Sequence, residues 1–198
     1  MSPSTAAVGV LMPVKAFRAA KHRLSPVLDG AERAALARRL ADRVIAAAHD
    51  LPVAVVCDDD EVAQWASDRA CTVLWRPGDG LNRAVSDGVA ALGEFDRIIV
   101  AHADLAKVED LRPLAAFAGV TLAPDRHRDG TNVLCLPAAT AFEFAYGAGS
   151  FARHRAEAHR LRLSVRVVIA EQYACDIDTP ADLDYSAMGA TAAVGTAQ

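Results

Sequence analysis

The sequence predicts an α/β domain with a mostly parallel sheet flanked by helices. Short apolar runs alternate along the chain with segments whose apolar residues recur every three to four positions. The connections are short, and neither an internal repeat nor a shift in composition marks a second domain. We therefore expect one domain over residues 1–187 and a frayed Ala/Gly/Thr-rich tail over residues 188–198.

The first half of the chain provides four of the expected strands. Each strand is an apolar run bounded by charged or turn-forming residues, and helices are expected where apolar residues take a helical spacing after a capping residue. In order, we expect a strand at 8–14, a basic turn-rich stretch at 15–30, a helix from about 29 to 49, a strand at 53–57, a helix start at 58–60, a strand at 72–75, a turn at 76–80, a helix at 82–92 and a strand at 97–101.

The second half keeps the same alternation. Ligands of open α/β sheets bind beyond the carboxyl ends of the strands, so the residues that follow each strand are the candidate functional residues. We expect a short helix at 108–117, a strand at 119–123, a charged loop at 124–130, a strand at 132–136, a helix at 149–161 and a last strand at 165–169.

Composition excludes several classes of protein. Hydrophobic residues make up 53% of the chain and the net charge is only −4, which excludes a disordered protein. No uncharged apolar stretch approaches the length of a membrane span, so we expect no membrane partner. An isoelectric point near 5.8 provides no basic field for nucleic acid, so any anion site must be built locally.

The cysteines and the N-terminus indicate a cytoplasmic protein. Cys57, Cys71, Cys135 and Cys175 form no C-x-x-C pair, and no histidine lies at zinc-finger spacing from them. Cys57 and Cys135 lie in apolar runs and are expected to be buried, reduced thiols. The first seven residues lack the basic and apolar regions of a signal peptide.

A basic stretch follows the first expected strand. It contains Lys15, Lys21 and Arg23, and two of the three lysines in the chain therefore lie there. Lysine is a compact point charge that suits a phosphate oxygen, which favours a triphosphate-binding loop. A solvated basic loop is the alternative, and the glycine-lysine pattern of a Walker-type loop is absent from the sequence.

Three aspartates form a candidate metal site. Asp104 directly follows the expected strand at 97–101, and Asp176 and Asp178 are two residues apart in an extended stretch, where their side chains point to the same side. Carboxylate oxygens are the ligands that Mg²⁺ prefers. The alternative role for Asp176 or Asp178 is to cap a helix that begins at Pro180. Capping accounts for one of these two aspartates but not readily for both.

Glycine-rich stretches and single side chains complete the set. Gly147 and Gly149 begin a G-x-G-x-x-A match, which is typical of dinucleotide-binding sites. The simpler interpretation is that Gly147, Gly149 and Ser150 lie at a helix N-terminus, where free backbone N–H groups bind phosphate or carboxylate. Asn82 and Asn132 are candidates to contact a base or ribose, and N-capping is the alternative for Asn82. Three histidines lie near these sites, His102, His127 and His154, and they are expected to be accessory or surface groups. Trp65 and Trp75 are expected to pack in the core.

Taken together, these motifs resemble the guanylyltransferases of coenzyme F-420 biosynthesis. These enzymes are the 2-phospho-L-lactate and phosphoenolpyruvate guanylyltransferases, relatives of the molybdenum-cofactor nucleotidyltransferases. The resemblance covers about residues 8–185 and rests on the joint order of the motifs. In sequence they are Pro13-Val-Lys15, Ala20-Lys-His-Arg-Leu24, Gly80-Leu-Asn82, His102-Ala-Asp104-Leu, Gly130-Thr-Asn132, Tyr146-Gly-Ala-Gly-Ser-Phe151 and Asp176-Ile-Asp-Thr-Pro-Ala-Asp-Leu183.

The resemblance implies a single-domain, Rossmann-like nucleotidyltransferase fold of the nucleoside-diphospho-sugar transferase type. It implies transfer of GMP from GTP to the phosphate of a small phosphorylated acid, with release of pyrophosphate. The implied roles are Mg²⁺ binding by Asp104, Asp176 and Asp178, triphosphate binding by Lys15, Lys21 and Arg23, acceptor binding by Thr131, Gly147, Gly149 and Ser150, and a place near the guanosine for Asn82.

Two departures from the family pattern leave the acceptor open among phosphoenolpyruvate, 2-phospho-L-lactate and 3-phosphoglycerate. Leu105-Ala-Lys107-Val replaces a more usual Leu-Pro-Leu-Leu and brings Lys107 close to the expected site, and His22 replaces a small hydroxyl residue.

The alternative functions are another nucleotidyl- or glycosyltransferase that uses Mg²⁺, a nucleotide sensor without catalysis, and a dinucleotide-binding protein. The sequence also leaves a homodimer open.

Overall fold

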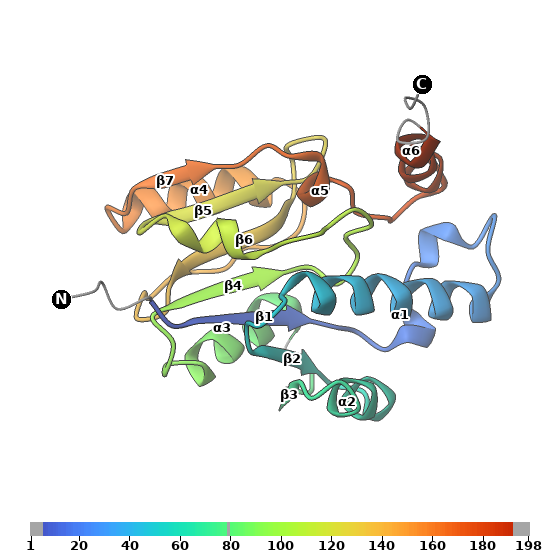
Figure 1. Cartoon of the computed structure of the whole chain (residues 1–198), viewed down its shortest axis with the longest axis horizontal. Helices are drawn as coiled ribbons and strands as arrows, with labels where there is room; N and C mark the ends of the chain where they lie inside the picture. Colours follow the sequence, from blue (N-terminus) through green and yellow to red (C-terminus); the bar gives the residue numbers. More distant parts are fainter. Residues whose placement is uncertain (1–5, 79, 192–198) are drawn as a thin grey trace, which may run out of the picture.

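A computed structural model describes residues 6–78 and 80–191 of the chain and confirms the expected α/β class (Figure 1). Its described residues form a seven-stranded sheet of order β3-β2-β1-β4-β6-β5-β7, in which β6 alone runs antiparallel to its neighbours. The strands are β1 (Val8–Pro13), β2 (Val53–Cys57), β3 (Thr72–Trp75), β4 (Arg97–Ala101), β5 (Val120–Pro124), β6 (Thr131–Pro137) and β7 (Val165–Val167).

Helices cover both faces of the sheet and lie close to where the sequence predicts them. The α-helices are α1 (Gly30–Ala47), α2 (Asp60–Ser67), α3 (Gly80–Ala91), α4 (Ser150–Arg160), α5 (Glu171–Ala174) and α6 (Pro180–Thr191). Three short 3₁₀ helices are η1 (Phe17–Ala19), η2 (His22–Leu24) and η3 (Arg112–Ala116). Within the described ranges, no helix is long and apolar enough to cross a membrane.

Three expected strands, at 53–57, 72–75 and 97–101, are confirmed with the same bounds. The short helix expected at 108–117 is wrong in type and length, because only Arg112–Ala116 is helical there and it is a 3₁₀ turn with proline in its first turn. The last strand ends at Val167, two residues before the expected end.

The core has one layer on each side of the sheet, and β1 contributes to both. Val10 and Met12 pack in the layer with α1 and α2, whereas Leu11 packs in the layer with α3 and α4. Helix α3 lies very close to β1, since a Cβ atom added at Gly88 would lie 2.7 Å from a Leu11 methyl group. Glycine at position 88 therefore lets α3 lie directly on β1.

A third, smaller apolar cluster joins distant parts of the chain. Leu24 from η2 and Leu40 from α1 pack with Cys175 and Ile177 from the segment before α6. All four residues are buried, so the basic stretch after β1 is held against the segment that carries Asp176 and Asp178. We refer to these four residues as the linking cluster.

Single-residue expectations are confirmed in part. The four cysteines are buried, free thiols in the described chain. Trp65 is 5% exposed and packs edge-on against Phe17, as expected for a core residue. The same expectation is wrong for Trp75, which is 42% exposed because it ends the edge strand β3.

The helix starts also follow the sequence. Asp29 and Glu32 form a reciprocal capping box at α1. α6 begins at Pro180, and the Asp182 carboxylate in its first turn accepts from the backbone N–H groups of Asp178 and Thr179 just before the helix. The expected domain boundary at residue 187 stays a prediction, and residues 192–198 of the expected tail lie outside the described residues.

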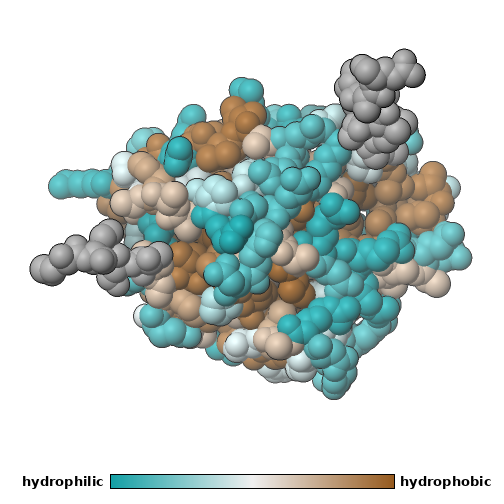
Figure 2. All heavy atoms as spheres, viewed as in Figure 1, coloured by the Kyte–Doolittle hydropathy of each residue, from teal (hydrophilic) through white to brown (hydrophobic). Residues whose placement is uncertain are grey.

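Hydrophilic and hydrophobic side chains are mixed over the face in Figure 2. At the right edge of this view, hydrophobic residues gather over the loop between η2 and α1, where Val27 is 52% exposed. This loop lies at the end of the basic stretch of residues 15–30, whose earlier residues line the candidate active site.

Candidate active site

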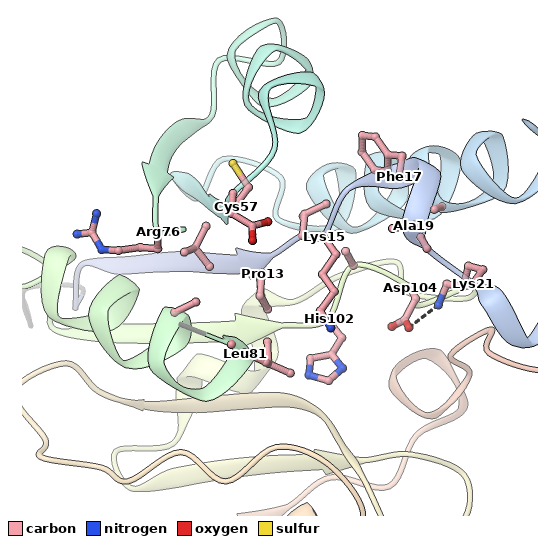
Figure 3. Close-up of a pocket in the computed structure, with 18 of the residues that line it drawn as sticks. Pro13, Lys15, Phe17, Ala19, Lys21, Cys57, Arg76, Leu81, His102 and Asp104 are labelled. Carbon is pink, nitrogen blue, oxygen red and sulfur yellow. Dashed lines mark hydrogen bonds and ion pairs between the residues drawn. The ribbon is translucent and has the colours of Figure 1, made fainter. Parts of the chain in front are cut away.

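One cavity of about 420 Å³ lies along the carboxyl ends of β3, β2, β1 and β4. Figure 3 shows most of the side chains that line it, and they come mainly from the ends of these four strands, the segments that follow them and the start of α3, with Ala37 from α1 and Asp178 from the segment before α6 completing the lining. This is the edge of an open α/β sheet where ligands bind. Its polar lining residues are Lys15, Lys21, Asp58, Arg76, His102, Asp104 and Asp178.

A partly buried ion pair marks the β4 end of the cavity. The Lys21 Nζ lies 2.6 Å from the Asp104 Oδ2, and only 9% of the Lys21 side chain is exposed (Figure 3). Burial alone would raise the pKa of Asp104, but the charges of Lys21 and His102 and the hydrogen bond from Lys21 outweigh it, so this pKa is lowered. Asp104 is therefore a carboxylate at neutral pH.

Lys21 is held at this place by an uncommon backbone conformation. Its φ of 58° puts it in the left-handed region, directly before η2. The turn directs the Lys21 side chain to Asp104 while Leu24, three residues on, enters the linking cluster. Lys15 also lines the cavity, and in Figure 3 its side chain extends toward His102.

Asp176 lies next to Asp104. A single antiparallel bridge joins Leu105 to Asp176, and the Ile177 N–H donates to the Asp104 carbonyl at 3.2 Å. Burial and the charge of Asp104 raise the pKa of Asp176, while a hydrogen bond from the Asn132 side chain at 3.1 Å opposes the rise. Asn132 therefore stabilises the ionised form of Asp176.

One oxygen of this carboxylate pair lacks a partner. Among the described residues, the Asp104 Oδ1 is buried and accepts no hydrogen bond. Such an oxygen is costly unless a cation or donor reaches it.

Asp178 has a different environment. Its Oδ2 lies 2.8 Å from the Arg23 Nη1, and both side chains are partly exposed, at 42% and 74%. In the described contacts the Asp178 and Asp176 carboxylates accept from Arg23 and Asn132 rather than from a backbone N–H of α6, which does not support the capping alternative. Within the part of the chain that the structure describes, no three His, Cys, Asp or Glu side chains are arranged as they stand to hold a metal ion, so the three-aspartate set stays a prediction.

Two of the expected acceptor residues, Thr131 and Ser150, lie at the start of β6 and at the start of α4. The Thr131 N–H donates to the Ser150 Oγ at 3.0 Å, and both residues are 1% exposed. Thr131 precedes Asn132, whose side chain reaches Asp176. The cavity-lining residues of the described chain do not include Thr131 or Ser150.

The expectation of free N–H groups at the start of α4 is wrong for Gly149 and Ser150. The Gly149 N–H donates to the Asp129 carboxylate at 3.0 Å, and the Ser150 N–H donates to the Gly147 carbonyl at 3.0 Å. A carboxylate at a helix N-terminus is favourable, so Asp129 takes the place that a ligand was expected to take.

Asn82 does not act as an N-cap, because α3 already begins at Gly80. Its Oδ1 accepts from the Tyr146 N–H at 2.6 Å and holds the loop before α4.

Lys107, which was expected close to the site, pairs with Glu171, and its Nζ lies 4.9 Å from the centre of the Tyr185 ring. His22 is exposed.

The expectation that His154 is an accessory or surface group is wrong about the surface, because the residue is buried. Its side chain is fully buried on α4, whereas His127 is exposed as expected. The Nδ1 of His154 lies 3.0 Å from the Thr131 Oγ1, and its Nε2 accepts from the Ala145 N–H at 3.0 Å. The available signal was its helical spacing from Phe151 and Ala158, which puts it on the apolar face of α4.

Comparisons with known proteins agree with this geometry. Phosphoenolpyruvate guanylyltransferase of Sphaerobacter thermophilus is 38% identical over 185 residues, 88% of this chain and 89% of that protein. 2-Phospho-L-lactate guanylyltransferase of Methanothermobacter thermautotrophicus is 34% identical over 183 residues, 87% and 81% of the two chains. A structure from Desulfovibrio desulfuricans G20, described provisionally as a nucleotide-diphospho-sugar transferase, superposes on this chain with a TM-score of 0.71 at 15% identity. The superposition covers 91% of this chain and 86% of that one.

The fold, the cation- and carboxylate-lined cavity and the guanylyltransferase relatives define an enzyme of the nucleotidyltransferase class. The family model described as guanylyl transferase CofC like matches residues 8–191. The chain belongs to this family, which confirms the resemblance drawn from its motifs.

Proposed function

We propose that this protein transfers GMP from GTP to the phosphate of a small phosphorylated carboxylic acid and releases pyrophosphate, in the cytoplasmic biosynthesis of coenzyme F-420. The observation that carries the proposal is the cavity in which Lys15 and Lys21 meet Asp104 and Asp178 at one edge of the sheet. Phosphoenolpyruvate is the first acceptor to test, because the relative at 38% identity bears that name. A homodimer stays a prediction.

Charge neutralisation is the main task in this reaction. An oxygen of the acceptor phosphate attacks the α-phosphorus of GTP, a new P–O–P bond forms, and the bond to the β-phosphate breaks to release pyrophosphate. Both reactants are anions, so catalysis rests on cations and in-line alignment rather than on a side-chain nucleophile. Lys15, Lys21 and Arg23 are the cations that we assign to the triphosphate.

The base end of the cavity follows from the spacing of the strands. Adjacent strands are about 4.8 Å apart, so the exits of β2 and β3 lie roughly 10–15 Å from the exit of β4, where the ion pair is. Asp58 and Arg76 are the polar side chains that line this end. A carboxylate can accept from both the N1–H and the amino group of guanine, and we assign that role to Asp58.

Mg²⁺ is the metal we assign to the carboxylates. The unpartnered, buried Asp104 Oδ1 and the raised pKa of Asp176 beside it fit a hard divalent cation, which would offset their mutual repulsion. Asp104 and Asp176 would hold it, and Asp178 would join them after release of Arg23. When bound, the ion neutralises charge on the phosphate oxygens and orients them.

Pyrophosphate release tests the proposal. The assay contains GTP, Mg²⁺ and phosphoenolpyruvate, 2-phospho-L-lactate or 3-phosphoglycerate, with ATP and CTP as controls for the base. Turnover with GTP and one acid is the expected result. GTP binding without turnover for any acid would favour a nucleotide sensor, and release of a nucleoside diphosphate would favour a glycosyltransferase.

A further inference from the structure

We propose that His154 is a positioning residue that directs the hydroxyl hydrogen of Thr131 toward the phosphorylated acid. The proposal rests on the proposed function and on the acceptor-binding role that the family resemblance implies for Thr131. His154 lies outside the cavity-lining set and has no assigned role. The evidence is its hydrogen-bond geometry, its burial and its position between α4 and β6.

The hydrogen bonds fix which nitrogen of His154 carries the proton. The Ala145 backbone N–H can only donate, and it points at the His154 Nε2 from 3.0 Å, so that nitrogen is the acceptor. In a neutral imidazole the hydrogen is then on Nδ1. The Nδ1 lies 3.0 Å from the Thr131 Oγ1 and donates to it.

This assignment sets the direction of the Thr131 hydroxyl. The Oγ1 already accepts from His154, so its own hydrogen points away from the imidazole ring. The Ser150 Oγ likewise accepts from the Thr131 N–H, so the Ser150 hydroxyl hydrogen points away from β6. Both hydroxyl groups are thus presented as donors, which is what an anionic carboxylate or phosphate requires.

Burial keeps His154 in this state. The ring has no exposed area and packs against Phe142, Phe144 and Tyr146, with the Tyr146 ring centre 4.7 Å away. Loss of solvation, assisted by the positive charge of Arg153 and by His102 and opposed by Glu157, lowers the pKa of His154 to about 4. A charged ring would place a second N–H against that of Ala145, so the neutral form is the one that fits.

The position of Thr131 connects this network to the carboxylates. Thr131 and Asn132 are the first two residues of β6, and successive side chains of a strand point to opposite faces. Thr131 meets His154 of α4 on one face, and Asn132 meets Asp176 on the other. Because β6 runs antiparallel to β4, Thr131 lies at the sheet edge where β4 ends and Asp104 follows, which is where we place the acid.

Two conservative variants separate positioning from structure. In His154→Asn the amide N–H can replace the Nδ1 donor to Thr131, whereas in His154→Gln the amide oxygen can replace the Nε2 acceptor for Ala145 but the donor is lost. We expect the KM for the acid to rise about tenfold to hundredfold in H154Q, the range for one hydrogen bond to a charged group, and to rise less in H154N. The KM for GTP should stay within about twofold in both variants.

A double-mutant test places the effect on Thr131. Thr131→Val removes the hydroxyl and keeps the shape, and H154Q should add little to the KM increase that T131V causes. Equal losses in H154N and H154Q, or a normal acid KM in H154Q, would overturn the proposal. Fully additive effects of H154Q and T131V would overturn it as well.

A second measurement does not depend on turnover. The ¹⁵N chemical shifts of His154 in the labelled protein report which ring nitrogen carries hydrogen, and we expect hydrogen on Nδ1. Hydrogen on Nε2 would overturn the proposal. Wild-type protein without turnover on any acid, but with Nδ1–H observed, would instead count against the proposed function.

Discussion

Replacement of Lys21 by methionine tests the ion pair at the centre of the site. The variant keeps most of the side-chain volume but removes the ammonium that lies 2.6 Å from the Asp104 Oδ2. Asp104 then stays beside Asp176 without a neighbouring cation, and its other oxygen already lacks a partner in the described chain. The protein without metal should therefore lose stability.

The size of the loss follows from the burial of the pair. Removing one partner of a buried pair costs about 3–5 kcal/mol, and the 25% exposure of the Asp104 side chain puts the expected loss at about 3 kcal/mol. For a domain of this length that corresponds to a melting temperature lower by about 6–12 °C. Urea unfolding with EDTA at neutral pH measures the loss.

The second substitution and the metal give the sharper test. Asp104→Asn in the K21M background removes the unpaired charge, so the double variant should recover at least about 1 kcal/mol. Added Mg²⁺ should stabilise K21M more than the wild-type protein, because Lys21 no longer competes for Asp104. A K21M protein within about 0.5 kcal/mol of wild type, or a double variant no more stable than K21M, would refute this reasoning.

Three further predictions concern catalysis, base choice and pH. Asp104→Asn and Asp176→Asn should each abolish pyrophosphate release while the circular dichroism spectrum stays that of wild type; wild-type rates in both would contradict the metal assignment. Asp58→Asn should lower kcat/KM for GTP about tenfold and narrow the preference for GTP over ITP, and an unchanged preference would remove Asp58 from base recognition. The pKa of His154 falls from its ordinary value of 6.5 to about 4, so between these pH values the unfolded chain binds a proton that the folded protein does not, and stability falls on acidification. Urea unfolding at pH 7 and 4.5 should show about 2–3 kcal/mol more loss for wild type than for H154N, and equal losses would contradict it.

Local patterns were enough to predict most of the sheet and part of the site. β2 and β4 are continuous apolar runs between charged residues, as expected of strands buried on both faces, so their bounds could be read directly. Asp104 and Lys15 follow such strands, and parallel strands bring their carboxyl ends to one edge. Their place in the cavity therefore followed from the fold class.

The remaining features depend on contacts between distant segments. The antiparallel direction of β6 is set by its place between β4 and β5, which no local pattern records. The pairing of Arg23 with Asp178 joins residues far apart in the chain. Asp129 occupies the α4 N-terminus only because the β5–β6 loop folds against Gly149, and the burial of His154 depends on the loop before α4.

The linking cluster determines when the site can form during folding. Leu24 and Leu40 lie near the start of the chain, and Cys175 and Ile177 lie near the end. Closing so long a loop costs entropy that is recovered only once these contacts are made. A nascent chain can therefore pair β1, β2, β3 and β4 on the ribosome while its basic stretch still lacks the aspartates of the 176–178 segment. The complete site forms only after nearly the whole chain has been synthesised, so incomplete chains cannot act on nucleotide.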